Sequence, residues 1–359
     1  MNGIDPPHSV GEEKARLQVI EFSSYEDVTG FWRELNHSYK DGDLTLDLKA
    51  HQLIWDHFYK PRGARLKILV GLEGGACIGI FPFIWNDRDP FDPPHWSLSD
   101  EFIIAREYFC PPESIHRFID YLPPHYSDDL SCFYVPQESR FFQRYGGGVV
   151  DLKSSPDEYL QSLTKKHRHT LKRTLHINED ITVVPDTRIR WDSIQAVLQQ
   201  QLDHWMKKTL TNSEEYYHYS RDKVSTDLVL MARAEEMERL VALYFYLKDE
   251  LVAANFSVRR ESNRVDDYVC LRSSREDLAW RGLGIFAILK NMDHARNQGL
   301  RFYDLSACLK DYKRKFINTE SSYYYLGYEG ISAAQGEAAG PAAEDPSPPT
   351  SPQTLNGRV

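Results

Sequence analysis

The chain has 359 residues, of which 41% are hydrophobic and 13% aromatic, and its formal net charge is −10. This length and composition are sufficient for two domains of ordinary size with packed cores. The negative charge excludes a protein that coats nucleic acid with its whole surface. We therefore expect no DNA partner and only local contact with any polyanion.

The cysteines and the apolar segments indicate the cellular compartment in which we expect the protein. The first eighteen residues lack the apolar core of a signal peptide, and no stretch approaches the roughly 20 apolar residues of a membrane helix. We expect a cytoplasmic protein without membrane insertion. The five cysteines are scattered without metal-ligand spacing, which is typical of thiols in a reducing compartment and predicts no metal: Cys77, Cys110, Cys132, Cys270 and Cys308.

Two segments share a β-hairpin pattern. Residues 71–83 and 246–258 align without a gap, and each has an apolar strand, a polar turn and a second apolar strand. A helix-like run with Asp-His-aromatic precedes each hairpin, at 54–60 and 201–207. The second half also carries a helical insert at about 213–239. This order indicates duplication of one α/β unit.

The junction between the two units is expected near residue 151. Ser155 is a candidate helix N-cap, Pro156 takes the first helical position, and Glu158 completes a capping box. The last residues are rich in Ala, Pro, Gly and Ser and cannot bury a core. We therefore expect a flexible N-terminus (1–14), an N-terminal lobe (15–150), a C-terminal lobe (151–330) and a disordered tail (331–359).

The helix that begins at Ser155 is predicted to continue to His176, with leucines on one side and cations on the other. Like charges four residues apart repel each other unless an anion neutralises them. The cationic side is therefore either a solvated surface or a site for a phosphate-bearing ligand, with Lys165, Arg168 and Lys172 as its candidates. His167 and His169 lie two residues apart, so they face differently on a helix and predict no metal site.

A second candidate site follows the strand expected at 266–274. There the segment "RGLG" leads into a helix that Gly299 ends, and a further strand follows. Glycines let backbone N–H groups approach phosphate oxygens, and a helix N-terminus favours negative charge. The candidate binding residues are Arg281, Gly282, Leu283 and Gly284. The pattern lacks the third glycine and the Lys-Ser/Thr of the common nucleotide-binding loops, so a simple tight turn remains the alternative.

The third candidate site lies between residues 304 and 316. Asp304 ends a predicted strand, where open α/β sheets place functional groups, and Tyr312 and Lys313 follow in a loop. The alternative interpretation of "KDYKRKF" is a solvated basic turn. The "YYYLGY" segment that follows predicts a half-buried closing strand.

Taken in this order, these elements resemble the GNAT acyltransferase superfamily over residues 20–328. The resemblance is to its double-lobed branch, which includes the Fem-type peptidoglycan aminoacyltransferases and the cellulose-biosynthesis, BioF2-like acetyltransferases. It implies an α/β (α+β) fold with two tandem GNAT-like lobes. Each lobe would have a mixed, mostly antiparallel central sheet flanked by helices.

The resemblance also implies a reaction. The chain would move an acyl group from acetyl-CoA, another acyl-CoA or another pantetheine thioester to an amine. The acceptor amine could belong to a sugar nucleotide or a cell-envelope or polysaccharide precursor. The amides of Gly282, Leu283 and Gly284 would hold the donor's pyrophosphate, although Ala279 stands where the family usually has Gln or Arg. A backbone N–H within 268–271 would stabilise the oxyanion.

The same resemblance implies chemical roles in the third site. Asp304 would be the base, Tyr312 the acid, and Lys313 would stabilise the leaving group or a phosphate. Ile317 stands where the Fem-type segment has glycine. Two alternatives stay open: a Fem-type transfer from aminoacyl-tRNA, which the net acidity disfavours, and a catalytically silent GNAT-like module that binds a sugar nucleotide or a partner protein.

Overall fold

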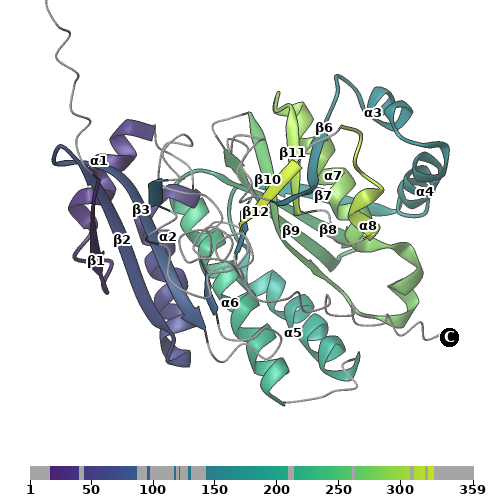
Figure 1. Ribbon diagram of the computed structural model, residues 1–359. Coiled ribbons are helices and arrows are strands. Elements are labelled where there is room, and N and C mark those ends of the chain that lie inside the picture. Colours follow the sequence, from purple (N-terminus) through teal and green to yellow (C-terminus); the bar gives the residue numbers. More distant parts are fainter. Residues whose placement is uncertain are drawn as a thin grey trace, which may run out of the picture.

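The computed structural model describes most of both predicted lobes. The described residues are 17–39, 44–86, 95–97, 117–118, 121, 128–130, 143–208, 214–260, 263–307, 311–319 and 322–326. The predicted end segments, 1–14 and 331–359, lie outside them. Within these residues the chain forms two sheets, which lie side by side in Figure 1.

The first sheet has four antiparallel strands in the order β1-β2-β3-β4: β1 (Gln18–Phe22), β2 (Arg65–Glu73), β3 (Ala76–Asn86) and β4 (His95–Ser97). Two helices precede β2: α1 (Thr29–Tyr39) and α2 (Leu48–Ile54), which continues into a π-helical turn at Trp55–Tyr59. Trp32 of α1 and Ile68 and Val70 of β2 are fully buried in a shared core. These elements make an α/β unit from the N-terminal part of the chain.

The second sheet has eight strands in the order β5-β12-β6-β11-β10-β9-β8-β7. Among the described strands, only β10 and β11 pair in parallel, which confirms the predicted mixed, mostly antiparallel sheet. The strands are β5 (Asp128–Leu130), β6 (Gln143–Asp151), β7 (Ile181–Asp186), β8 (Leu240–Leu247), β9 (Glu250–Arg260), β10 (Arg264–Arg272), β11 (Phe302–Ala307) and β12 (Ser322–Leu326).

Helices cover both faces of this sheet. Ala242 and Tyr244 of β8 pack in the core under α5 (Trp191–Lys208) and α6 (Glu214–Glu236), whereas Leu243 and Phe245 pack against α7 (Leu283–Asn297). This alternation is the two-residue period of a strand that is buried on both sides. The remaining helices are α3 (Pro156–Ser162), α4 (Lys165–His176) and α8 (Asp311–Arg314). Among the described residues, no helix is long and apolar enough to cross a membrane.

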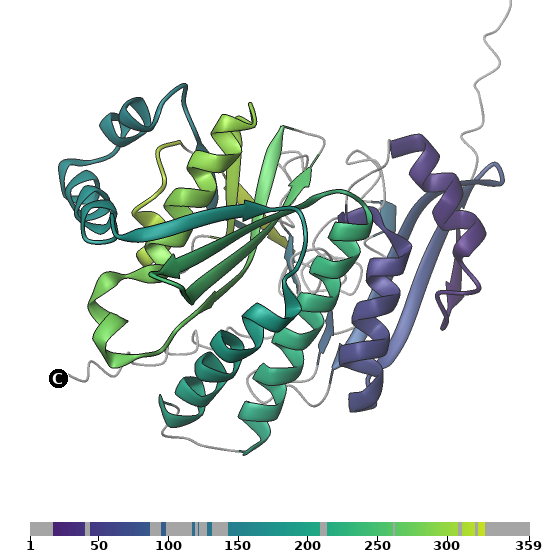
Figure 2. The ribbon, with the colours of Figure 1, turned by 180° about the vertical axis from the view of Figure 1, so that it is seen from behind.

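The two sheets are joined through α2 and α6, which lie next to each other in both views (Figures 1 and 2). The Arg233 guanidinium of α6 binds both carboxylate oxygens of Asp47, at 2.7 and 3.0 Å. The same carboxylate caps α2 by accepting a hydrogen bond from the Ala50 N–H at 3.0 Å. The start of α2 is therefore fixed to the second unit.

The structure confirms the two predicted hairpins. β2 and β3 are joined by Gly74 and Gly75, and β8 and β9 by Lys248 and Asp249. Lys248 takes a positive φ of 58° in its turn. α6 occupies the predicted helical insert. β5 and β6 precede residue 151 but belong to the second sheet, so the lobe boundary at 150/151 stays a prediction.

The single helix predicted from Ser155 to His176 is wrong. Its start is confirmed, because the Ser155 hydroxyl accepts a hydrogen bond from the Glu158 N–H at 3.2 Å. The first helix ends at Ser162, because the next residue, Leu163, has an extended ψ of 158°. Thr164 then caps a new helix by accepting a hydrogen bond from the His167 N–H at 3.3 Å. The break lets Leu160, Leu163 and Leu171 enter one core from two helices.

Candidate active site on the second sheet

Strands β10 and β11 diverge in the middle of the second sheet. Their described pairing covers three residue pairs and ends at Asp266 with Asp304, although β10 continues to Arg272 and β11 to Ala307. β10 also has a bulge, because its register with β9 shifts between Asp267 and Val269. Beyond Asp266 the facing edges of the two strands therefore offer backbone polar groups that the β10–β11 ladder does not use.

A cavity of about 290 Å³ lies at the far end of β10. Its walls come from α5, from the end of β10 and the following loop, from a 3₁₀ turn (η6, Glu276–Arg281) and from the first residues of α7. The lining residues are Gln201, His204, Arg272, Ser273, Ser274, Arg275, Leu278, Ala279, Gly282 and Leu283. The "RGLG" segment therefore borders a hollow in the surface.

Gly282 forms the corner between η6 and α7. Its φ of 64° lies in the left-handed region, which glycine adopts without the steric penalty of a Cβ. Its carbonyl accepts hydrogen bonds from the N–H groups of Ile285 and Phe286, at 2.9 and 3.1 Å. The N–H groups of Leu283 and Gly284 belong to the first helical turn and have no partner within the helix. They suit an anion at the cavity.

The Arg281 side chain is already engaged elsewhere. Its guanidinium binds both carboxylate oxygens of Asp180, at 2.6 and 2.9 Å, and donates to the Ile177 carbonyl at 3.2 Å. The Asn178 amide donates to the Arg281 carbonyl at 2.9 Å. The hydrogen bonds from Arg281 lower the pKa of Asp180. Arg281 thus ties the loop to the segment that follows α4.

Arg272 is the cation at this cavity that sequence reasoning missed. A Cβ added at Gly284 would lie 3.2 Å from Nη1 of Arg272, so the guanidinium lies over the first turn of α7. In the described part of the chain, this guanidinium has no hydrogen-bond or ion-pair partner, whereas the Arg272 N–H donates to Gln201 at 2.8 Å. A cation beside a helix N-terminus is unfavourable unless an anion joins it. The sequence signal that could have indicated Arg272 is its place at the end of a predicted strand.

The basic helix α4 presents fewer of its candidate phosphate-binding cations than its sequence suggests. Lys165 and Lys172 of α4 are exposed. Arg168 instead turns back and donates to the carbonyls of Gln161 and Leu163, at 3.3 and 3.1 Å, so it caps the end of α3. The structure brings the chain after α4 to the "RGLG" loop through Arg281, but it leaves Arg168 bound to backbone.

Asp304 lies in a buried ionic cluster. Its side chain is only 6% exposed and its carboxylate is 3.4 Å from Nη2 of Arg264. Arg260 and Arg264 both also bind Asp266, which pairs with Asp304 across the two strands. Paired residues of a parallel ladder share one face, and Tyr303 packs under α7, so the cluster lies on the other face.

Lys313 and Tyr312 lie on α8. The Lys313 ammonium donates a hydrogen bond to the Leu305 carbonyl, and the Tyr312 side chain is 39% exposed. The charge of Lys313 also acts to lower the pKa of Asp267, a carboxyl to which the sequence analysis gave no role.

Asp267 is the second residue that sequence reasoning missed. Its carboxylate is half-buried and accepts hydrogen bonds from the Asn255 amide at 3.0 Å and the Tyr303 hydroxyl at 2.8 Å. Burial raises the pKa of this carboxyl above its ordinary value, and the charge of Asp304 adds to that rise. The two hydrogen bonds and Lys313 oppose it. The only sequence signal was a paired aspartate within an apolar strand.

A buried polar network holds Asp267 in place. The Tyr303 hydroxyl also lies 3.3 Å from the Ser257 hydroxyl, and Asn291 of α7 donates to Ser257 at 2.6 Å and to Asn255. Connected polar networks of this kind rigidify a core, and the one atom of Asn291 that stays without a partner among the described residues is its side-chain oxygen. Asp267 is therefore a fixed, protonatable group at the point where β10 and β11 separate. Within the described residues no group of three or more His, Cys, Asp and Glu side chains could hold a metal ion.

No protein-family model matches the sequence, and no curated protein matches it. Many solved structures are similar to it in chain path at low identity, among them the following three. FemX is 10% identical, with 88% of this chain and 99% of FemX covered and a TM-score of 0.47. The C-terminal domain of a putative lysylphosphatidylglycerol synthetase from Agrobacterium fabrum is 14% identical, with coverages of 88% and 95% and a TM-score of 0.44.

The third is a tandem GNAT protein from the clavulanic acid biosynthesis pathway. It is 9% identical, with 87% of this chain and 99% of that chain covered and a TM-score of 0.42. With identities this low and TM-scores below 0.5, the functional proposal rests on the molecule's own geometry.

Proposed function

We propose that the chain is a GNAT-type N-acyltransferase of the double-lobed, Fem-like kind, which transfers an acyl group from acyl-CoA or another pantetheine thioester to an amine. The observation that carries this proposal is the divergence of β10 and β11 beyond Asp266, together with the cavity at the end of the same strand β10 and the start of α7. It combines an opening for an extended acyl donor with a site for the donor's phosphates.

The phosphates are proposed to bind at the cavity. The N–H groups of Leu283 and Gly284 supply hydrogen bonds, and the Arg272 guanidinium supplies the positive charge. Arg272 takes the place of the Gln or Arg that the family has at the position of Ala279. Arg281 supports the loop from behind through Asp180. The cavity residues thus fit a phosphate-bearing donor.

The extended arm of the donor is proposed to lie between β10 and β11. An amide-containing chain can pair with the free edge of a strand through main-chain hydrogen bonds. The bulge at Tyr268 turns the local backbone, which supports the proposed oxyanion N–H within 268–271. The thioester carbonyl would then lie near Asp267.

The chemistry requires one base, one acid and one stabilised oxyanion. Asp267 accepts the proton that the acceptor's ammonium group loses, and its raised pKa makes it a stronger base than an ordinary aspartate. The amine nitrogen bonds to the carbonyl carbon, the carbon–sulfur bond breaks, and the thiolate takes a proton. Tyr312 is proposed to donate that proton, with Lys313 stabilising the developing charge.

Asp304 stays a prediction as the base, but its burial and its ion pair with Arg264 favour Asp267 for that role. Donor binding in the C-terminal lobe (151–330), a cytoplasmic location and a sugar nucleotide or polysaccharide precursor as acceptor also stay predictions. The N-terminal lobe (15–150) is proposed to support this site through the contact between α2 and α6.

Calorimetric titration with acetyl-CoA tests the donor site. The wild-type protein should bind, and Arg272→Gln should weaken binding about 10- to 100-fold, since a charged hydrogen bond contributes about 1.5–3 kcal/mol. Arg188→Gln is the matched control, because it removes an exposed arginine next to the opposite end of α5. If acetyl-CoA and longer acyl-CoAs fail to bind the wild type, the proposed function is wrong.

The exposed lysines of α4 favour aminoacyl-tRNA as the second candidate donor. That donor predicts activity lost to ribonuclease, binding that falls steeply with salt, and weaker binding for Lys165→Glu with Lys172→Glu. Binding of acetyl-CoA that the double lysine variant leaves unchanged would instead show that α4 is a solvated face.

A further inference from the structure

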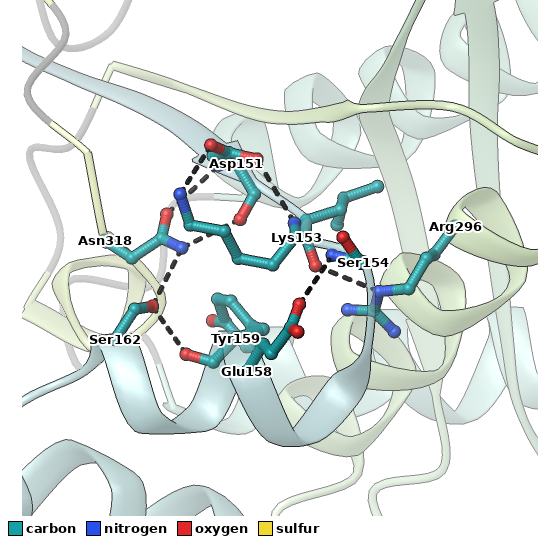
Figure 3. A network of polar contacts seen from close by, with 9 residues as sticks. Asp151, Lys153, Ser154, Glu158, Tyr159, Ser162, Arg296 and Asn318 are labelled. Atoms are coloured by element: carbon teal, nitrogen blue, oxygen red, sulfur yellow. Dashed lines mark hydrogen bonds and ion pairs between the residues drawn. The ribbon is translucent and has the colours of Figure 1, made fainter.

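The chain that follows Lys313 is attached to β6 and α3, and its Asn318 side chain makes the first of these contacts (Figure 3). The Asn318 amide pairs with the backbone of Asp151, the last residue of β6. It accepts from the Asp151 N–H at 3.0 Å and donates to the Asp151 carbonyl at 2.8 Å, as a neighbouring strand would. It also donates to the Ser162 hydroxyl of α3 at 3.0 Å.

Tyr159 of α3 makes a second attachment. Its hydroxyl donates to the Phe316 carbonyl at 2.9 Å, and the tyrosine ring and Phe316 are both almost completely buried in the same core. Two residues of one short segment, Phe316 and Asn318, are thus bound to α3 and β6.

The attachment point is itself rigid. The Arg296 guanidinium of α7 donates to the Leu152 carbonyl at 2.9 Å, just after β6 (Figure 3). It also binds Asp293 at 2.7 Å. The arginine is only 7% exposed. Because α7 also begins at the cavity, the anchor of the Lys313 segment and the donor site share one helix.

α8 needs such an anchor. It has four residues, and one helical turn orders several backbone dihedrals for very few hydrogen bonds. A lysine side chain also loses rotamer freedom when its ammonium group is fixed, as that of Lys313 is on the Leu305 carbonyl. Its position therefore depends on contacts outside the turn.

We propose that Asn318 and Tyr159 are positioning residues, which hold α8 so that the Lys313 ammonium stays on the Leu305 carbonyl of β11, two residues from Tyr303, whose hydroxyl binds Asp267. This inference rests on the proposed function, in which Asp267 is the base. Neither side chain lines the cavity proposed for the donor. They act through Lys313.

The surroundings of Asp267 show why this contact matters. β9 presents Asn255, β10 presents Cys270, β11 presents Tyr303 and Asp304, and α7 acts through Asn291 on Asn255. Of the groups that act on this carboxyl in the described part of the chain, Lys313 carries the positive charge. Movement of α8 should therefore raise the pKa of Asp267.

The test is the carboxyl pKa of Asp267, measured by ¹³C NMR on the full chain without substrate. Lys313→Gln should raise it by about 1 unit. Asn318→Ala should raise it in the same direction. In the double variant the pKa should match that of Lys313→Gln alone, because Asn318 acts only through the lysine.

Glu158→Ala is the matched control. Glu158 belongs to the same network but contacts the Ser154 N–H, not the Lys313 segment, so the pKa should stay at the wild-type value. An Asn318→Ala protein with an unchanged Asp267 pKa overturns the proposal. A double variant in which that pKa is higher than in Lys313→Gln alone also overturns it. Should Asn318→Ala fail to fold, Tyr159→Phe keeps the buried ring and decides by the same measurement.

Kinetics separate this inference from the proposed function. In an active enzyme, Asn318→Ala should lower kcat with little change in the KM of the donor, and should move the acid limb of the pH–rate profile to higher pH. If the wild type transfers no acyl group, the proposed function fails. The pKa measurements on the Asn318 and Lys313 variants then still test whether Asn318 acts on Asp267 through Lys313.

Discussion

The two faces of the β10–β11 pair hold their carboxylates in opposite ways. On the face away from α7, Asp266 and Asp304 are buried among arginines and neutralised by them. On the face toward α7, Asp267 is half-buried and receives its hydrogen bonds from neutral groups, Asn255 and Tyr303. The sequence distance between Asp266 and Asp267 is a single residue, so the strand alternation alone separates a structural carboxylate from a titratable one.

This difference matters for assigning chemistry. Removal of a carboxylate that is paired with buried cations leaves those cations uncompensated and destabilises the fold, and such a carboxylate has little freedom to accept a proton from a substrate. A carboxyl held by neutral donors in a partly buried place has a raised pKa and can exchange a proton. We therefore expect substitutions on the two faces to affect different properties.

Asp267→Asn should give the largest effect, on catalysis. The rate of acyl transfer should fall about 10²- to 10⁴-fold, the usual contribution of a general base. The melting temperature should change little, since the new amide oxygen can still accept from Asn255 and Tyr303. Steady-state kinetics and a thermal melt on the same preparation check both statements. Full activity in Asp267→Asn would contradict the assignment of Asp267 as the base.

Asp304→Ala should act mainly on stability. Its removal leaves Arg264 buried with one carboxylate fewer, and breaking a buried pair costs about 3–5 kcal/mol. Urea unfolding measures this loss. The double variant Asp304→Ala with Arg264→Met should recover a large part of it. A stable but inactive Asp304→Ala protein would instead support the role of Asp304 as the base.

The pH dependence of stability should give the smallest effect. The folded-state pKa of Asp267 is raised above its ordinary 3.8, so the native state binds the proton more tightly than the unfolded chain. Stability should therefore fall as pH rises from about 4 through the raised pKa, with a slope of at most about 1.4 kcal/mol per pH unit. The difference between wild type and Asp267→Asn, measured by urea unfolding across this range, isolates the contribution. A difference that stays constant with pH contradicts it.

The sequence predicted the elements better than the site. Periodic apolar residues and turn glycines located the hairpins, the start of α3 and the loop into α7, because these signals are local. The break at Thr164 was missed, since a threonine within a cationic run is compatible with a continuing helix until tertiary packing bends it.

The site depends on contacts between distant segments. Arg281 follows the pattern of a phosphate-binding residue, but Asp180 lies a hundred residues away in sequence and takes its guanidinium. Arg272 and Asp267 carry no motif at all. The cavity beside Arg272 and the raised pKa of Asp267 both result from the sheet order and the approach of α7. A single sequence shows neither the sheet order nor this approach.

The bulge at Tyr268 changes the face of the sheet to which the residues of β10 point. Val265 packs under α7, whereas Val269 and Leu271 pack under α5 and α6, although all three have odd positions and an unbroken strand would turn them to one side. One additional residue thus reverses the phase of the strand between its two halves. A β10 that kept Tyr268 without the bulge would turn Val269 and Leu271 toward α7, whereas deletion of Tyr268 would straighten the strand and leave both side chains under α5 and α6. The bulge is therefore what allows a strand with this extra residue to maintain two cores.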